Sequence, residues 1–130
     1  MASILAVTTA AAEHTVYYRY VVLGFVKDAA GKALPERSVE VVRNKTGLAY
    51  SARTDAQGFF VVIVRLGDES AGETLTVRAG SAVTTITTRF DPANHTADRG
   101  TRVDLEGPRF VERTSAFQPT LVRFVGDGRH

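Results

Sequence analysis

The chain has 130 residues, of which 44% are hydrophobic and 23% charged, as expected for a single globular domain with one core. It contains no cysteine, which excludes a disulfide framework and a thiolate metal site. The net charge of +2 is too small to indicate nucleic-acid binding, and no apolar run approaches the roughly 18 residues of a membrane-spanning helix.

Residues 1–15 form a short segment before the first predicted strand. Ile4, Leu5 and Val7 make it apolar, and the alanines at 10–12 resemble a signal-peptide cleavage site. A secretory signal begins with a positively charged region, whereas the first basic residue here is Arg19. We therefore interpret residues 1–15 as an N-terminal arm and not as a convincing signal peptide.

Alternating side chains and β-branched residues predict seven strands between residues 16 and 106. Turns separate them, two of which begin at Asp28 and Asp55 and end at Gly31 and Gly58. The aspartate of such a turn bonds its own backbone, and the glycine accepts a positive φ. No segment has a persuasive helical period, so the pattern predicts an antiparallel β-sandwich. The predicted strands cover residues 16–27, 37–43, 48–54, 59–66, 74–79, 82–90 and 101–106.

Two of these strands are apolar on both faces, although a sandwich strand normally exposes one face to water. On strand 59–66, Val62 and Val64 share one face, and Val61 and Ile63 share the other. Strand 16–27 has the same property. Both faces therefore need cover, either from the tails of this chain or from another chain.

Residues 107–130 carry phenylalanines at seven-residue intervals, and burying each would contribute roughly 1.5–3 kcal/mol. This spacing suits a heptad helix, but Pro108 and Pro119 with β-branched neighbours favour an extended C-terminal arm with an extra strand at 120–125. We expect the two arms to mediate self-assembly. The residues expected to make these contacts are Ile4, Leu5, Val7, Phe110, Phe117, Leu121 and Phe124.

The stretch from Gly24 to Pro35, followed by Val39-Glu40-Val41 and by Thr54 to Phe60, resembles the carboxypeptidase regulatory-like domain. The resemblance covers about residues 20–106 and implies a transthyretin-like β-sandwich with a non-catalytic, accessory role at the cell surface or outside the cell. A sister family of this fold hydrolyses 5-hydroxyisourate. The C-terminal Tyr-Arg-Gly-Ser which that enzyme needs does not occur here, so we predict no enzyme.

Other candidate sites are weaker. His95 shares a polar loop with Asp91 and Asp98, whose carboxylates suit Ca²⁺, but a solvated loop explains the same residues, and we predict no metal and no cofactor. No serine lies in a nucleophile elbow. Asn44 and Asn94 begin glycosylation sequons, which also occur by chance in turns, so glycosylation stays open.

The sequence thus predicts an all-β, seven-stranded, antiparallel, transthyretin-like sandwich at residues 16–106, between arms at 1–15 and 107–130. The predicted function is structural: self-assembly of a cell-surface or extracellular protein into an oligomer or filament, by adding an arm to an exposed sheet edge. Its partners would be copies of itself or another surface protein. The alternative is a monomeric accessory module for carbohydrate or protein, with its tails folded back and a site near loops 67–73 and 91–100.

Overall fold

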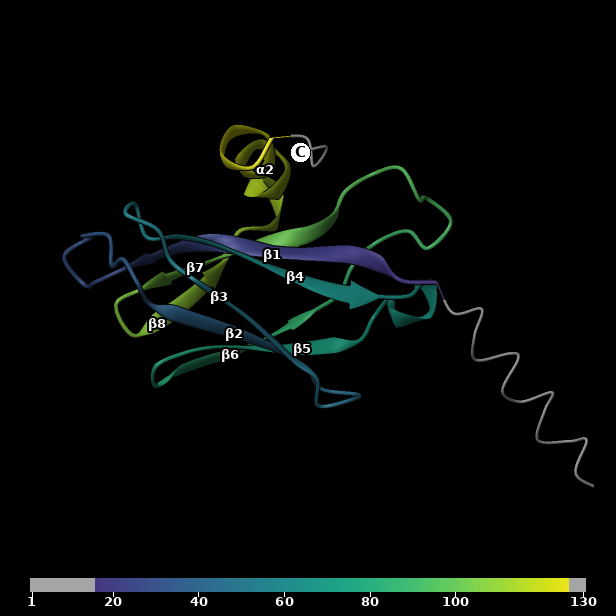
Figure 1. The fold of residues 1–130 in the computed structure, drawn as a ribbon, viewed down its shortest axis with the longest axis horizontal. Coiled ribbons are helices and arrows are strands. Elements are labelled where there is room, and N and C mark those ends of the chain that lie inside the picture. The colour runs from purple at the N-terminus through teal and green to yellow at the C-terminus, as the bar shows by residue number, and fades with distance from the viewer. Residues whose placement is uncertain (1–15, 127–130) are drawn as a thin grey trace, which may run out of the picture.

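The computed structural model describes residues 16–126, which form two four-stranded β-sheets packed face to face (Figure 1). One sheet has the strand order β4-β1-β7-β8, and the other has the order β3-β2-β5-β6. This arrangement confirms the predicted β-sandwich. The strands are β1 (Tyr18–Lys27), β2 (Ser38–Arg43), β3 (Ala49–Arg53), β4 (Phe59–Leu66), β5 (Thr74–Ala79), β6 (Ala82–Thr87), β7 (Arg99–Glu106) and β8 (Arg109–Glu112).

The strand count and the strand directions differ from the prediction. The described residues contain eight strands, because the chain turns at Gly107 and β8 returns antiparallel to β7. The sheets are also not wholly antiparallel, since β1 and β7 run parallel, with Tyr20 opposite Arg99. Long connections through the other sheet separate β1 from β7, so no hairpin dictates their relative direction.

The strand predicted at residues 120–125 is wrong. Residues Phe117–Phe124 form the helix α2, which follows a 3-10 turn, η2 (Thr114–Ala116). Pro119 is the third residue of α2, where a backbone N–H would have no partner within the helix, so the proline does not interrupt it. Phe117, Leu121 and Phe124 follow one another at four- and three-residue intervals and share one helix face. The C-terminal tail is therefore folded, and the extended arm predicted at 107–130 is not observed within residues 107–126.

The main core lies between the two sheets. Side chains at even positions of β1 and β4 point into it, and burial raises the pKa of Tyr20 to about 12. The buried members of this core are Tyr20, Val22, Val26, Val39, Val41, Phe60, Val62, Val64, Leu66, Leu75, Val77, Ala79, Ile86, Val103 and Leu105.

A second, smaller core forms on the outer face of the β1-containing sheet, where α2 lies across the strands (Figure 1). Helix α2 thereby covers part of the second apolar face of β1 and β4 from the same chain, whereas Ile63 of β4 stays exposed. The buried members of this second core are Val21, Leu23, Phe59, Phe117 and Leu121.

The two Asp-x-x-Gly turns form as predicted. Asp28 accepts hydrogen bonds from the backbone N–H groups two and four residues on, and Asp55 does the same. Gly31 and Gly58 close the turns with φ angles of 86° and 76°. Each turn is specified by groups within four residues, which explains why the sequence alone predicts it.

Candidate functional site

The first two predicted assembly residues of α2 are buried within their own subunit. Phe117 is 6% exposed and Leu121 is 2% exposed, and both pack against Val21 and Leu23 of β1. Residues this deeply buried are not available for contact with another copy. The structure therefore places this part of the predicted assembly surface inside the fold.

The other predicted assembly residues are dispersed. Phe124 is 45% exposed, and its ring centroid lies 5.3 Å from that of Phe25 and 5.1 Å from that of Phe59. Phe110 lies in β8, the edge strand opposite β4 in the same sheet, and packs against the main core. The remaining three, Ile4, Leu5 and Val7, lie outside the described residues.

Buried charge fastens the C-terminal tail to the sheet. Asp104 is buried, with only 3% of the residue exposed. Its carboxylate accepts hydrogen bonds from the Phe25 N–H, from Arg102 and from Arg113. Arg102 also donates to the Thr120 hydroxyl in α2, at 3.0 Å. Charge-assisted bonds of this kind are stronger than neutral ones, so α2 is held by polar contacts as well as by its apolar face.

The three loop residues considered for a cation do not converge. His95 hydrogen-bonds Asp68 through Nε2 at 2.8 Å, whereas Asp98 pairs with Arg19 at 3.9 Å. Asp91 accepts a bond from the backbone N–H two residues on. Among residues 16–126 no three histidine or acidic side chains gather in a way that would hold a metal ion.

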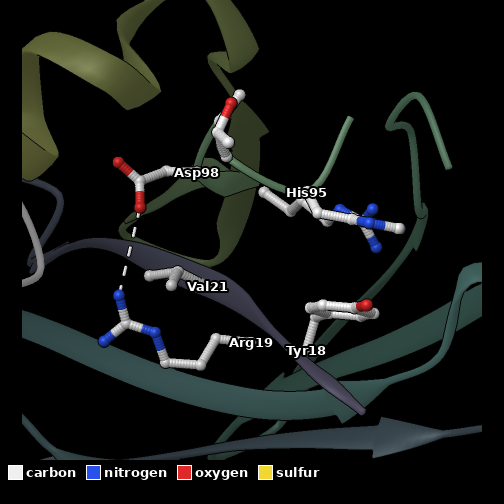
Figure 2. Close-up of a pocket in the computed structure, with 8 residues that line it drawn as sticks. Tyr18, Arg19, Val21, His95 and Asp98 are labelled. Carbon is white, nitrogen blue, oxygen red and sulfur yellow. Dashed lines mark ion pairs between the residues drawn. The ribbon is translucent and has the colours of Figure 1, made fainter. Parts of the chain in front are cut away.

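A pocket of about 220 Å³ lies between the start of β1 and this loop (Figure 2). Figure 2 shows the Tyr18 and His95 rings face to face at one end, and the Arg19–Asp98 ion pair at the other. The ring centroids of Tyr18 and His95 are 4.8 Å apart, and the ring planes differ by 10°.

Arg99 also lines this pocket and contacts two aromatic rings. Its guanidinium lies 4.9 Å from the centroid of the Tyr18 ring and 4.2 Å from that of Phe90, and the side chain is 5% exposed. Arg99 Nη2 donates to Asp68 at 3.1 Å and to backbone carbonyls of the loop. The hydrogen bond from His95, followed by that from Arg99, lowers the pKa of Asp68. These contacts hold the loop against β1 and against the turn η1 (Asp68–Ser70).

A second concave surface follows the side of the sandwich where β3 and β4 are the edge strands. Two depressions of about 440 and 400 Å³ share Tyr17, Tyr50 and Arg65, and together we term them the edge groove. Tyr17 is 49% exposed and Ile63 is 43% exposed. The other lining residues are Tyr18, Arg19, Arg43 and Leu48.

The backbone of β4 faces this groove with unpaired groups. The Val26 N–H donates to the Gly58 carbonyl, and this bond fixes which residues of β4 turn their backbone groups toward β1. Because the direction alternates along an antiparallel pair, Val61, Ile63 and Arg65 turn theirs away from β1. No strand pairs with that side of β4 among residues 16–126.

Sequence reasoning found part of this surface. The apolar character of both faces of strand 59–66 indicated that Ile63 would need cover, and the structure leaves Ile63 exposed. Tyr17 and Tyr50 were not singled out, because they come together only when the first and third strands lie in different sheets.

No family model matches the chain, and neither a curated protein nor a solved structure matches it. In the part of the chain that the structure describes, no helix is long and apolar enough to cross a lipid bilayer.

Proposed function

We propose that this chain is a non-catalytic structural module that associates with copies of itself. The observation that carries the proposal is the edge of β4, where the backbone groups of Val61, Ile63 and Arg65 have no partner among residues 16–126 and the side chain of Ile63 is exposed. A strand edge with these features is a template for pairing with another chain. The transthyretin-like topology and the extracellular or cell-surface location belong to the same proposal and rest on the resemblance to the carboxypeptidase regulatory-like domain.

The pairing of the charged side chains supports a non-catalytic role. Arg43 and Glu73 form an ion pair at 2.8 Å with side chains 8% and 12% exposed, and the Arg43 hydrogen bond lowers the pKa of Glu73. Asp68 and Asp104 are likewise held by arginines. Each of these carboxylates bonds elements of the fold together, which is a structural role.

The way the C-terminal tail folds changes the mechanism of assembly that we propose. Phe117 and Leu121 cover their own sheet, so the C-terminal tail is not the donor of an added strand. The acceptor is the edge of β4, and the added strand comes either from the N-terminal arm with Ile4, Leu5 and Val7, which lies outside the described residues, or from the matching edge of a second copy.

The test is the mass of the full chain by sedimentation velocity, from low to high micromolar concentration. We expect the weight-average mass to rise with concentration above that of one chain. A mass that stays at one chain over the whole range would contradict self-association.

A monomeric accessory module is the second candidate, and two observations favour it. The C-terminal tail is folded back, as this alternative requires, and the edge groove presents the tyrosines Tyr17 and Tyr50 next to Arg65. Aromatic faces beside polar groups are suited to packing against a sugar ring or a peptide. Binding of a glycan or peptide to a chain that stays monomeric, with loss of binding in Tyr50→Ala, would favour this candidate.

A further inference from the structure

We infer that the contact between copies is a symmetric antiparallel pairing of two β4 strands, in which Ile63 lies opposite Ile63 of the second copy. The inference rests on the proposed self-association and specifies its interface. It makes one eight-stranded sheet from the two four-stranded sheets that contain β4.

The backbone of β4 selects this register. The outward-facing groups belong to Val61, Ile63 and Arg65, whereas those of Phe59 are already bonded to Asp55 within the turn. A twofold axis at Ile63 places Val61 opposite Arg65 of the second copy and uses all three residues. The resulting ladder has about six hydrogen bonds, two for each opposed pair.

The registers with a twofold axis at Val61 or at Arg65 are poorer. An axis at Val61 places Ile63 opposite Phe59, whose N–H and carbonyl are already hydrogen-bonded to Asp55. An axis at Arg65 brings two guanidinium groups directly opposite each other, and like charges in that position destabilise a sheet. With the axis at Ile63, the two Arg65 residues are about 14 Å apart along the strands, at about 3.4 Å per residue.

The side chains of β4 suit a copy of the same strand. Ile63, 43% exposed, meets an identical apolar side chain, and Val61 meets the stem of Arg65. The strand has no proline and no lysine, and its register with β1 is continuous over eight residue pairs. Proline, lysine and β-bulges are among the features by which natural proteins protect a sheet edge; β4 has none of these, and its one charged residue is Arg65.

The remaining edge strands of the sandwich are shorter than β4. Strand β3 has five residues and carries Arg53, which pairs with Glu36 at 3.8 Å, and β8 has four residues. The edge of β6 is open as well and carries Val83, which is 56% exposed, but three of its six residues are the threonines at 84, 85 and 87. We therefore assign the interface to β4 and use β6 as the matched comparison.

Hydrogen exchange of the wild-type full chain at low and high concentration tests the assignment directly. We expect the amides of Val61, Ile63 and Arg65 to exchange at least about tenfold more slowly in the associated state, because in the single chain they have no partner among the described residues. The amides of β6 should not change. Protection confined to β6, β3 or β8 would overturn the assignment while leaving self-association in place.

Two matched lysine variants give a second readout. In Ile63→Lys two ammonium groups would lie opposite each other, so we expect association at least about tenfold weaker. Thr85→Lys adds the same charge to the edge of β6 and should associate like the wild type. The reverse pattern, or equal association of both variants, would contradict the β4 interface. Thermal unfolding of each variant verifies that the fold is retained, and the wild-type exchange data decide the question if Ile63→Lys does not fold.

Deletion of residues 2–12 separates this interface from donation by the N-terminal arm. A β4–β4 contact predicts that the shortened chain associates as the wild type does. If the deletion abolishes association, the arm supplies the added strand, and the symmetric pairing is wrong. If the wild-type chain itself stays monomeric, the proposed function fails first.

Discussion

The ring of Phe117 lies directly over Gly100, so that a Cβ atom at position 100 would come within 2.6 Å of the Phe117 Cζ atom. The same Cβ would lie 2.1 Å from the carbonyl oxygen of Val21 in the neighbouring strand. Glycine in β7 therefore allows α2 to approach the sheet closely. The position of α2 on the sheet therefore depends on a contact between two residues that are 17 positions apart in the sequence.

Gly100→Ala should destabilise the domain by at least about 1–3 kcal/mol, as an added methyl group does in a closely packed site. The obstructing atom at Val21 belongs to the backbone and has no rotamer through which to move away. Urea unfolding would measure the change. Val122→Ala is the control, because Val122 is 55% exposed on α2, and its truncation should cost little. Equal stability of Gly100→Ala and the wild type would contradict the close approach.

Two phenylalanines of α2 should differ in their contribution to stability. Phe117 is 6% exposed and Phe124 is 45% exposed, so Phe117→Ala leaves a cavity and Phe124→Ala mostly removes a surface contact. We expect Phe117→Ala to lose about 3–5 kcal/mol and Phe124→Ala distinctly less. Denaturant titration of the two variants would show this order, and a larger loss for Phe124→Ala would place the helix differently on the sheet.

The Arg43–Glu73 pair should matter more than the exposed pair of Arg53 and Glu36. Replacing Glu73 by glutamine leaves the buried guanidinium of Arg43 without its negative partner, and we expect a loss of about 1–3 kcal/mol. The side chains of Arg53 and Glu36 are 69% and 78% exposed, so Glu36→Gln should change stability by less than about 1 kcal/mol. Unfolding free energies at pH 7 provide the comparison. Equal losses would indicate that burial does not distinguish the pairs.

Asp68 should make the stability of the domain depend on pH in the acidic range. Its pKa is lowered in the folded state by His95 first and by Arg99 second, so folding favours the carboxylate. The stabilisation is therefore complete above the unfolded pKa of about 3.9 and is lost as the pH falls through the lower pKa of the folded state. Asp68→Asn should be less stable than the wild type at pH 7, and the difference should shrink in acid. A difference that grows as the pH falls would contradict this sign.

Local patterns in the sequence predicted most of the strands and the turns between them. The Asp28 and Asp55 turns are fixed by hydrogen bonds that span four residues or fewer, and the alternation along β5 reproduces its buried and exposed positions. Some boundaries moved: the strand predicted at 82–90 ends at Thr87, and the one predicted at 101–106 begins at Arg99. The two-faced apolar character of strand 59–66 predicted that both of its faces need cover; the main core covers one face, and α2 covers Phe59 on the other but leaves Ile63 exposed.

The amino-acid sequence by itself determined that this chain is a β-sandwich of short strands, because side-chain alternation and turn chemistry act over a few residues. Only the tertiary structure decided what covers the sandwich and what remains open. Residues 120–125 are β-prone in isolation, but the apolar face of β1 stabilises them as a helix whose Phe117 and Leu121 it buries. The parallel pairing of β1 with β7 and the open edge of β4 are likewise set by contacts between distant segments, which no local pattern encodes.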